Sequence, residues 1–247
     1  MKIGMTSLTL RNHSVEDVVR LAKEAGISCI EWGVSDGHVI LCDKERADEI
    51  IKLSEEYGVE IASLGSYCRM ENKEDCDMAV ETAVLLKAPV IRIWAGTRSP
   101  AKCDDEYRKL IVENTVYMAD KAKEHGIILG FEYHPFTLTE NCDDAMWLIE
   151  AVNKENVRLY WQPDRALSAE ENVRDRDRTR KASSGIMHIQ NYVADVGYGM
   201  LSSIEDLLDA FYTDIKDESY KLMIEFVKDG SIENLNEDAK TLRKILY

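Results

Sequence analysis

The stretch KEHGIILGFE, residues 123–132, contains the pattern that organises the whole chain. Its charged first half is typical of the end of an amphipathic helix, and Gly126 follows where a left-handed residue commonly ends a helix. The apolar run 127–131 is short and rich in Ile, which is typical of a buried strand. Because the run leads into Glu132, the stretch predicts a helix, a glycine turn and a strand with a carboxylate at its end.

The same pattern recurs along the chain in KEAGISCIEW (23–32), EEYGVEIASL (55–64) and LLKAPVIRIW (85–94). In each stretch a charged amphipathic segment stops at Gly or Pro and an apolar run begins. Such junctions fall near positions 26, 58, 89, 126, 156, 185 and 218, at intervals of about 30 residues with one longer interval. This spacing is the length of one strand–helix unit.

Together with an N-terminal strand, the junctions predict eight strands and eight helices in alternation. The strands are expected at 2–8, 27–32, 59–64, 89–94, 127–132, 156–162, 185–190 and 220–226. The helices are expected at 14–25, 43–57, 72–87, 104–125, 141–153, 169–183, 203–214 and 232–246. The pattern predicts a single (β/α)8 barrel over residues 1–247. A doubly wound sheet is the alternative, but it usually has a Gly-rich loop after its first strand, and SLTLRNHS (7–14) contains no glycine.

Composition excludes several functional classes. The formal net charge of −15 disfavours binding to nucleic acid or to an anionic membrane, and the basic run 174–181 is interleaved with aspartates. No apolar stretch approaches the roughly 20 residues of a membrane span, and the N-terminus lacks a signal-peptide profile. The six cysteines have no zinc-site spacing, so we expect free thiols in a reducing cytoplasm.

Polar side chains gather at the predicted strand ends, where barrels of this kind place their active sites. Glu132 and Glu225 end two apolar runs, and a third run carries His188 and Gln190 two residues apart, on one face of a strand. Carboxylates, an imidazole and an amide meeting at one mouth suit a divalent cation or a proton shuttle.

Several strand-end residues have structural interpretations as well as functional ones. Glu31 is expected to pair with a neighbouring Arg or Lys, and Arg92 to pair with Glu132 or to clamp substrate. His134, before a proline, either bonds the loop backbone or orients a carboxylate. Trp94 is expected to pack and not to serve as a sugar platform.

The chain resembles the xylose isomerase-like TIM barrels, the sugar phosphate isomerase/epimerases. The resemblance is carried in order by LGFEYHPFTLTENCDDAMWLIEAV (129–152), GIMHIQNY (185–192), the GYG at 197–199 and MIEFVKDGS (223–231). It implies a metal site built from Glu132, a residue of the sixth strand, Gln190 and Glu225. The aspartate that the family has on the sixth strand falls on Gln162, and Asp164 lies two residues further on.

By the same resemblance, Glu132 and Glu225 form the acid/base pair of an isomerase or epimerase acting on a small sugar or sugar derivative beside its carbonyl. A divalent ion such as Mn²⁺ or Mg²⁺ is implied, held additionally by Gln190 with Gln162 or Asp164. Substrate oxygens are assigned to His188 and Arg92, and the remaining substrate-binding candidates are His134, which would orient Glu132, Trp94 and Glu31.

Other functions stay open at this point. A dehydratase of an inosose- or dehydroshikimate-like substrate would use the same barrel and carboxylates. A metal-free, non-catalytic sugar-binding barrel is favoured by the amide at Gln162, since two carboxylates hold a hard cation weakly. The zinc-dependent abasic-site endonucleases share the fold, but the acidic charge argues against that activity. The expected partner is a small molecule, and the sequence is compatible with a homo-oligomer.

Overall fold

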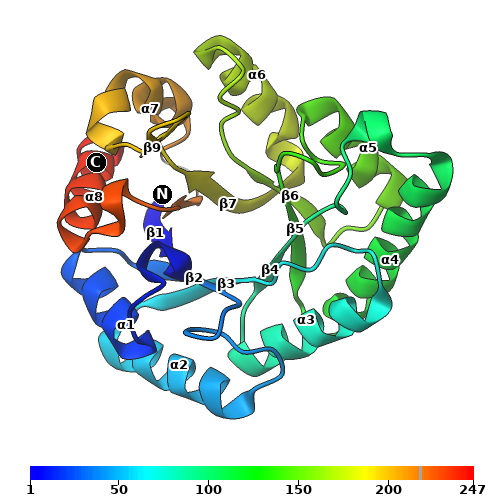
Figure 1. Cartoon of the computed structure of the whole chain (residues 1–247), viewed down its shortest axis with the longest axis horizontal. Coiled ribbons are helices and arrows are strands. Elements are labelled where there is room, and N and C mark those ends of the chain that lie inside the picture. Colours follow the sequence, from blue (N-terminus) through cyan, green and yellow to red (C-terminus); the bar gives the residue numbers. More distant parts are fainter. Residues whose placement is uncertain (217–218) are drawn as a thin grey trace.

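Eight parallel strands close into a barrel in a computed structural model that describes residues 1–216 and 219–247. Around the barrel the strands follow the order β1-β10-β7-β6-β5-β4-β3-β2, and the helices form a ring outside them (Figure 1). The predicted single (β/α)8 barrel is therefore confirmed. The junction expected near 218 lies outside the described residues.

The observed elements agree with the predicted ones to within a few residues at each end. The barrel strands are β1 (Lys2–Thr6), β2 (Cys29–Gly33), β3 (Glu60–Gly65), β4 (Val90–Ile93), β5 (Ile128–Glu132), β6 (Val157–Trp161), β7 (Ser183–Ile189) and β10 (Lys221–Ile224). The α-helices are α1 (Val15–Glu24), α2 (Lys44–Tyr57), α3 (Lys73–Leu86), α4 (Asp105–Glu124), α5 (Cys142–Val152), α6 (Ala169–Thr179), α7 (Glu205–Tyr212) and α8 (Ile232–Leu246).

The junction at 123–132 shows how the local sequence produces this alternation. Helix α4 ends at Glu124, and Gly126 takes a left-handed φ of 69° that a residue with a side chain would adopt at a cost. The turn lets the Ile127 N–H donate to the carbonyl of Ala122 at 2.9 Å, which directs the chain back into β5. A charged helix end, a glycine and an apolar run are therefore sufficient to make the turn.

The inside of the barrel holds its own small cluster of buried side chains. It consists of Cys29, Ala62, Val90, Tyr160, Ile186 and Met223, and it is separate from the larger core between strands and helices. Gly130 of β5 leaves the space that the ring of Tyr160 fills. This layer forms the floor beneath the polar residues at the strand ends.

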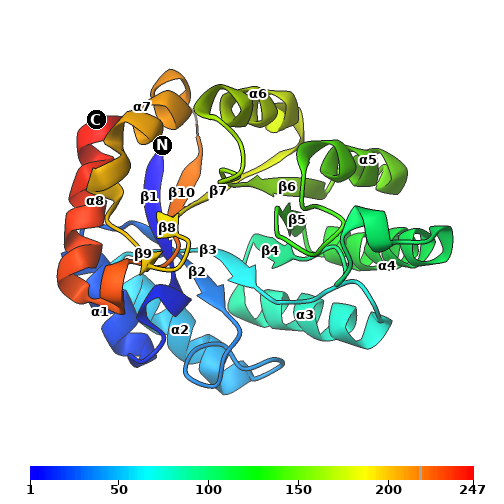
Figure 2. The ribbon, with the colours of Figure 1, turned by 45° about the horizontal axis from the view of Figure 1, so that its top comes forward.

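One pair of short strands in the structure was not predicted from the sequence. A two-stranded antiparallel hairpin, β8 (Tyr192–Val193) and β9 (Gly197–Tyr198), follows β7 before the chain enters α7. Figure 2 shows this hairpin in front of the barrel strands. The ring of Tyr198 packs at 4.9 Å from the ring of Phe226, which follows β10, so the hairpin is attached to the strand-end loops.

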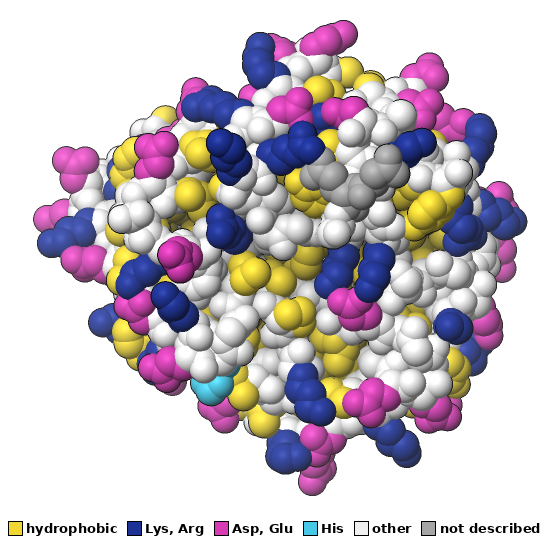
Figure 3. All heavy atoms as spheres, turned by 180° about the vertical axis from the view of Figure 1, so that it is seen from behind, with side chains coloured by type: hydrophobic (Ala, Val, Ile, Leu, Met, Phe, Trp, Pro, Cys, Tyr) yellow, Lys and Arg dark blue, Asp and Glu magenta, His cyan; other side chains and the backbone are white. Residues whose placement is uncertain are grey.

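The surface carries both signs of charge. On the face seen from behind in Figure 3, Lys and Arg side chains are interspersed with Asp and Glu, and hydrophobic side chains lie between them. Within the described part of the chain, none of the helices is long and apolar enough to cross a membrane.

Candidate active site

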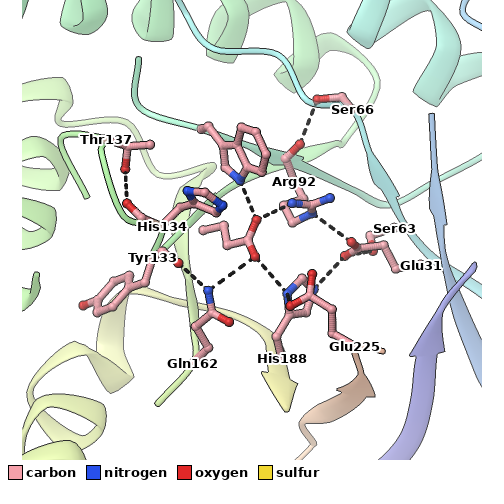
Figure 4. Close-up of polar contacts among 12 residues, drawn as sticks. Glu31, Ser63, Ser66, Arg92, Tyr133, His134, Thr137, Gln162, His188 and Glu225 are labelled. Carbon is pink, nitrogen blue, oxygen red and sulfur yellow. Dashed lines mark hydrogen bonds and ion pairs between the residues drawn. The ribbon is translucent and has the colours of Figure 1, made fainter. Parts of the chain in front are cut away.

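The carboxyl ends of the strands bring together a buried cluster of charged residues. Glu31 comes from β2, Arg92 from β4, Glu132 from β5 and His188 from β7, and all four are buried. Glu225 follows β10 directly and points into the same group (Figure 4). The structure therefore converges the two glutamates that the sequence singled out.

Arg92 lies between two carboxylates. Its Nε donates to Glu31 Oε1 at 2.8 Å, and its Nη1 donates to Glu132 Oε2. Glu31 also accepts a hydrogen bond from the hydroxyl of Ser63 at 3.0 Å. The guanidinium is thus held by both acids, and the structure places Glu31 and Arg92 as partners of one another.

His188 spans the same two carboxylates from the other side. Its Nδ1 lies 3.0 Å from Glu132 Oε1, and its Nε2 lies 3.3 Å from Glu31 Oε2. An ionised carboxylate only accepts hydrogen bonds, so both ring nitrogens must carry protons for both bonds to form. Although burial opposes the charge, Glu31, Glu225 and Glu132 hold the pKa of His188 well above its usual value. His188 is therefore an imidazolium in this arrangement.

Glu132 accepts hydrogen bonds from four neighbouring side chains. Its Oε2 accepts from Arg92 and from the indole N–H of Trp94, and its Oε1 accepts from His188 and from Gln162 Nε2 at 3.4 Å. Burial works against its ionisation, but Arg92 and His188 outweigh burial and lower its pKa. Glu132 is a stable carboxylate with four donors around it.

Glu225 has a different environment. Its Oε2 accepts one hydrogen bond, from Gln190 Nε2 at 2.9 Å, and lies 3.6 Å from His188 Nδ1. Its side chain is 12% exposed, against 2% for Glu132, so it is the more accessible acid. Burial raises its pKa to about 7, with the negative charge of Glu132 adding to the effect and His188 opposing it. A carboxyl group with this pKa can both accept and donate a proton near neutrality.

The amides and the sixth-strand loop complete the cluster. Gln190 Nε2 donates to Gln162 Oε1 at 3.3 Å, so the two amides are linked beside the glutamates. Asp164 is turned away: its carboxylate accepts from the N–H of Ala166 at 2.8 Å, and its own N–H donates to Asn172. Of the two sixth-strand candidates, the structure brings only Gln162 to the site, because Asp164 starts the turn through Arg165 and Ala166 that follows β6.

His134 does not orient Glu132. Its Nδ1 lies 2.8 Å from the carbonyl oxygen of Pro135, in the loop after β5. Trp94 takes the orienting role through its indole N–H, and its ring is packed against His134 at 4.3 Å and against the guanidinium of Arg69 at 4.3 Å. The neighbours of Trp94 agree with its expected packing role.

The donor atoms fit a divalent cation. Glu132, His188 and Glu225 each offer one ligand atom, and these atoms lie within 4.8 Å of one another. Carboxylate oxygens and an imidazole nitrogen suit Mn²⁺, Mg²⁺ or Zn²⁺, with the amide oxygens of Gln162 and Gln190 nearby as neutral ligands. His188 Nδ1 can bind an ion only as a neutral ring, so its use as a ligand requires loss of a proton.

Sequence reasoning missed two inward-facing residues. Ser63 bonds Glu31, and the ring of Tyr160 packs edge-on to His188 at 5.3 Å. Strand parity was the missed signal for Tyr160, which stands two residues before Gln162. Ser63 breaks simple alternation, because the pairing of β2 with β3 shifts register there and the adjacent Ala62 also lies in the barrel interior. Counting alternate residues back from Gln162 would have found Tyr160, whereas counting back from the predicted end of the third strand at position 64 leads to Ala62.

Comparison with known proteins places this geometry in a family. The profile of the xylose isomerase-like TIM barrels matches residues 19–218. A 3-dehydroshikimate dehydratase of Bacillus anthracis is 22% identical over 169 residues, which are 64% of this chain and 60% of that protein. A 2-oxo-tetronate isomerase of Haemophilus influenzae is 28% identical over 92 residues, 35% of this chain and 36% of that protein. The chain thus matches less than two thirds of the length of these relatives.

Solved structures share the whole fold at low identity. A probable 3-DHS dehydratase of Bacillus anthracis superposes with a TM-score of 0.78 at 17% identity, covering 98% of this chain and 99% of that chain. A D-allulose 3-epimerase of Methylomonas sp. gives 0.73 at 15% identity, with 100% and 98% covered. A xylose isomerase-like barrel of Mycobacterium smegmatis in complex with magnesium gives 0.69 at 16% identity, with 99% and 96% covered.

Proposed function

The chain belongs to the xylose isomerase-like TIM barrel family, and from this premise we propose that it is a metal-assisted isomerase or epimerase of a small sugar or sugar derivative. The reaction moves a proton on a carbon next to a carbonyl group. Relatives named isomerase, epimerase and dehydratase support an enzymatic role. The observation that carries the proposal is that Glu132 and Glu225 differ in their hydrogen bonds, their exposure and their pKa.

Glu225 is the group we assign to proton transfer. It accepts one hydrogen bond, is the more exposed carboxylate, and burial raises its pKa to about 7. Two carboxyl groups whose surroundings separate their pKa values commonly divide acid and base roles between them. In our proposal Glu225 therefore removes the proton from the carbon beside the carbonyl group and, once protonated, delivers it to the neighbouring carbon.

Glu132 is the second carboxylate of the pair, with a mainly positioning role in the arrangement described. Its oxygens accept from four donors, so Glu132 fixes the positions of the Arg92, His188 and Trp94 side chains. Arg92 and His188 bring positive charge to the place where negative charge develops on a carbonyl oxygen. A divalent ion, when held by Glu132, Glu225 and the neighbouring amides or imidazole, would polarise the carbonyl oxygen of the substrate.

Deuterium exchange tests the assignment. We expect a panel of ketoses and ketose phosphates, incubated in D2O with Mn²⁺, to include one that takes up deuterium beside its carbonyl. Glu225→Gln should slow that exchange by roughly 100-fold or more, the usual contribution of a general acid–base group, with little loss of thermal stability. Glu132→Gln should reduce both exchange and stability, because it leaves Arg92 and His188 as buried cations with one acid fewer.

The matched control is Glu55→Gln on the exposed side of α2, which should change neither the rate of deuterium exchange nor the thermal stability. Exchange that persists at the wild-type rate in both Glu132→Gln and Glu225→Gln would refute the assigned roles.

A dehydratase is the second candidate, favoured by the Bacillus anthracis relative that spans 64% of this chain. The same carboxyl group beside a carbonyl can begin an elimination that expels water. Mass spectrometry separates the two reactions, because an isomerised product keeps the substrate mass and a dehydrated one loses 18 Da. A metal-free, non-catalytic sugar-binding barrel is the third candidate, supported by the amide at Gln162, and ion titration tests it.

A further inference from the structure

The exposed side chains of Arg11 and Arg165 lie near the candidate active site. Among the residues that the structure describes, neither Arg11 nor Arg165 forms an ion pair, although the chain carries an excess of acidic residues. Both side chains belong to exposed residues. A guanidinium has five N–H donors, so both groups retain donors for a ligand.

Arg165 is connected directly to the site. Its Nη2 donates to Gln190 Oε1 at 3.3 Å, and Gln190 in turn donates to Glu225 at 2.9 Å. Its guanidinium also lies 4.2 Å from the ring centroid of Tyr192 in the β8–β9 hairpin. One amide therefore separates Arg165 from the carboxyl group that we assign to proton transfer.

Arg11 approaches the same region from the other side. Its guanidinium lies 5.2 Å from the ring centroid of Phe226, the residue after Glu225, and the ring of Tyr198 lies 4.9 Å from Phe226. The ring of Tyr198 contacts both Tyr192, at 5.4 Å between ring centroids, and Phe226, and each of these two rings packs against one of the guanidinium groups. Burial and the charge of Glu225 raise the pKa of Tyr198, whereas Arg165 and Arg11 lower it, so all three charges act on its hydroxyl group.

The arrangement provides an anion site next to the reacting group. We propose that Arg165 and Arg11, with the hydroxyl of Tyr198, bind a carboxylate or phosphate group of the substrate. The inference rests on the proposed function and narrows its substrate class to an acidic sugar derivative. Guanidinium groups bind planar carboxylates and phosphates through paired hydrogen bonds, which gives these two side chains the chemistry for such a group.

An anionic ligand would be repelled by the negative charge of the chain and of the active-site glutamates. The chain has a net charge of −15, and Glu225 stands beside the site with a second acid, Glu132, close behind it. An anionic ligand approaches such a surface only where local positive charge outweighs the acids. Arg165 and Arg11 supply that charge on the two sides of the hairpin contact.

Calorimetric titration with matched ligand pairs tests the proposal in the full-length protein with Mn²⁺ present. The pairs are D-threonate with threitol, and D-ribulose 5-phosphate with D-ribulose. We expect the wild type to bind the anionic member of at least one pair roughly 10-fold more tightly, and the responding pair identifies the charged group. Arg165→Gln should remove that preference, Arg11→Gln should reduce it, and neither should change the Kd of the neutral member.

Arg174→Gln on the exposed face of α6 removes the same charge elsewhere and should leave the preference intact. Equal affinity for both members of both pairs in the wild type, or an equal loss for both members in Arg165→Gln, would overturn the proposal.

The two proposals fail separately. If deuterium exchange occurs with neutral ketoses as readily as with acidic ones, the anion site is wrong and the isomerase proposal stands. If Arg165 controls anion binding but no tested compound exchanges, the site stands and the proposed reaction does not.

Discussion

At the scale of single residues, the site shows how neighbours give two glutamates different chemistry. Two buried acids and two buried cations balance one another's charge: Glu31 and Glu132 are the acids, and Arg92 and His188 are the cations. Glu225 is the remaining acid, and burial raises its pKa to about 7, although the charges of His188 and Arg92 oppose the rise. The difference between Glu225 and Glu132 follows from the number of donors around each.

Asp238 of α8 gives a pH-dependent prediction away from the site. Its Oδ1 accepts from the N–H of Leu201 at 2.8 Å, but its buried Oδ2 has no partner among the described residues. Burial raises its pKa to about 6. Because the folded pKa lies above the unfolded one, this acid lowers the free energy of unfolding as pH rises from about 4 to about 6, and the loss persists above that range.

We therefore expect Asp238→Asn to gain stability relative to the wild type between pH 4 and pH 7, by about 1–2 kcal/mol after solvent screening. Urea denaturation of both proteins across that range measures the difference. The exposed Asp36→Asn serves as the control and should follow the wild type at every pH. A difference between Asp238→Asn and the wild type that stays constant with pH would contradict the raised pKa.

The sequence indicated which residues converge but not how they pair. Strand parity put Glu132, His188, Gln190 and Glu225 at one mouth, because alternate residues of each strand face inward. Parity carries no information on the chain after a strand ends. Asp164 shared the parity of Gln162, yet its carboxylate accepts from the N–H of Ala166 in the turn that follows. The orienting donor to Glu132 likewise came from Trp94, on the neighbouring strand, and not from His134 in the following loop.

At the scale of elements, regular units were predictable and the short hairpin was not. The helix-to-strand junctions carry a charged end, a turn residue and an apolar run, and each signal has a local physical cause. The strands β8 and β9 have two residues each, too short for any periodic pattern. Their position depends on ring contacts such as Tyr198 with Phe226, which only the tertiary fold brings together.

Strand β5 must have glycine at position 130. A Cβ at Gly130 would fall on the ring of Tyr160, which is fully buried and packs against His188. We expect Gly130→Ala to destabilise the protein by about 1–3 kcal/mol, the usual cost of overpacking, and to lower activity by displacing the ring toward His188. Thermal denaturation and the exchange assay measure the two effects.

Gly37→Ala, outside the barrel strands, is the matched control for Gly130→Ala. A Cβ there would meet its nearest neighbour at 3.5 Å, an ordinary contact, so stability should stay close to that of the wild type. If Gly130→Ala were as stable and active as Gly37→Ala, the ring of Tyr160 would not be fixed in the way that we describe.

At the scale of the whole molecule, an ion at the barrel mouth should couple the strands that hold it. Glu132 belongs to β5 and Glu225 follows β10, so one ion would join two parts of the barrel that the chain connects through the helices α5, α6 and α7. An ion that binds only the folded chain stabilises it by about 2.7 kcal/mol at 100 times its Kd. For a barrel of this size we expect the melting temperature to rise by roughly 5–10 °C in saturating Mn²⁺.

Thermal denaturation with and without Mn²⁺ in wild type and two variants decides between the alternatives at this site. Glu225→Gln should lose the ion-dependent rise, because it removes one of the two carboxylates of the cluster. Asp164→Asn should keep the full rise, since that carboxylate is bonded to its own loop.

A rise that disappears in Asp164→Asn would move the metal site to the loop after β6. No rise in the wild type, with no ion found in the purified protein, would favour the metal-free sugar-binding barrel, because Gln162 then leaves the two glutamates too little charge to retain a hard cation.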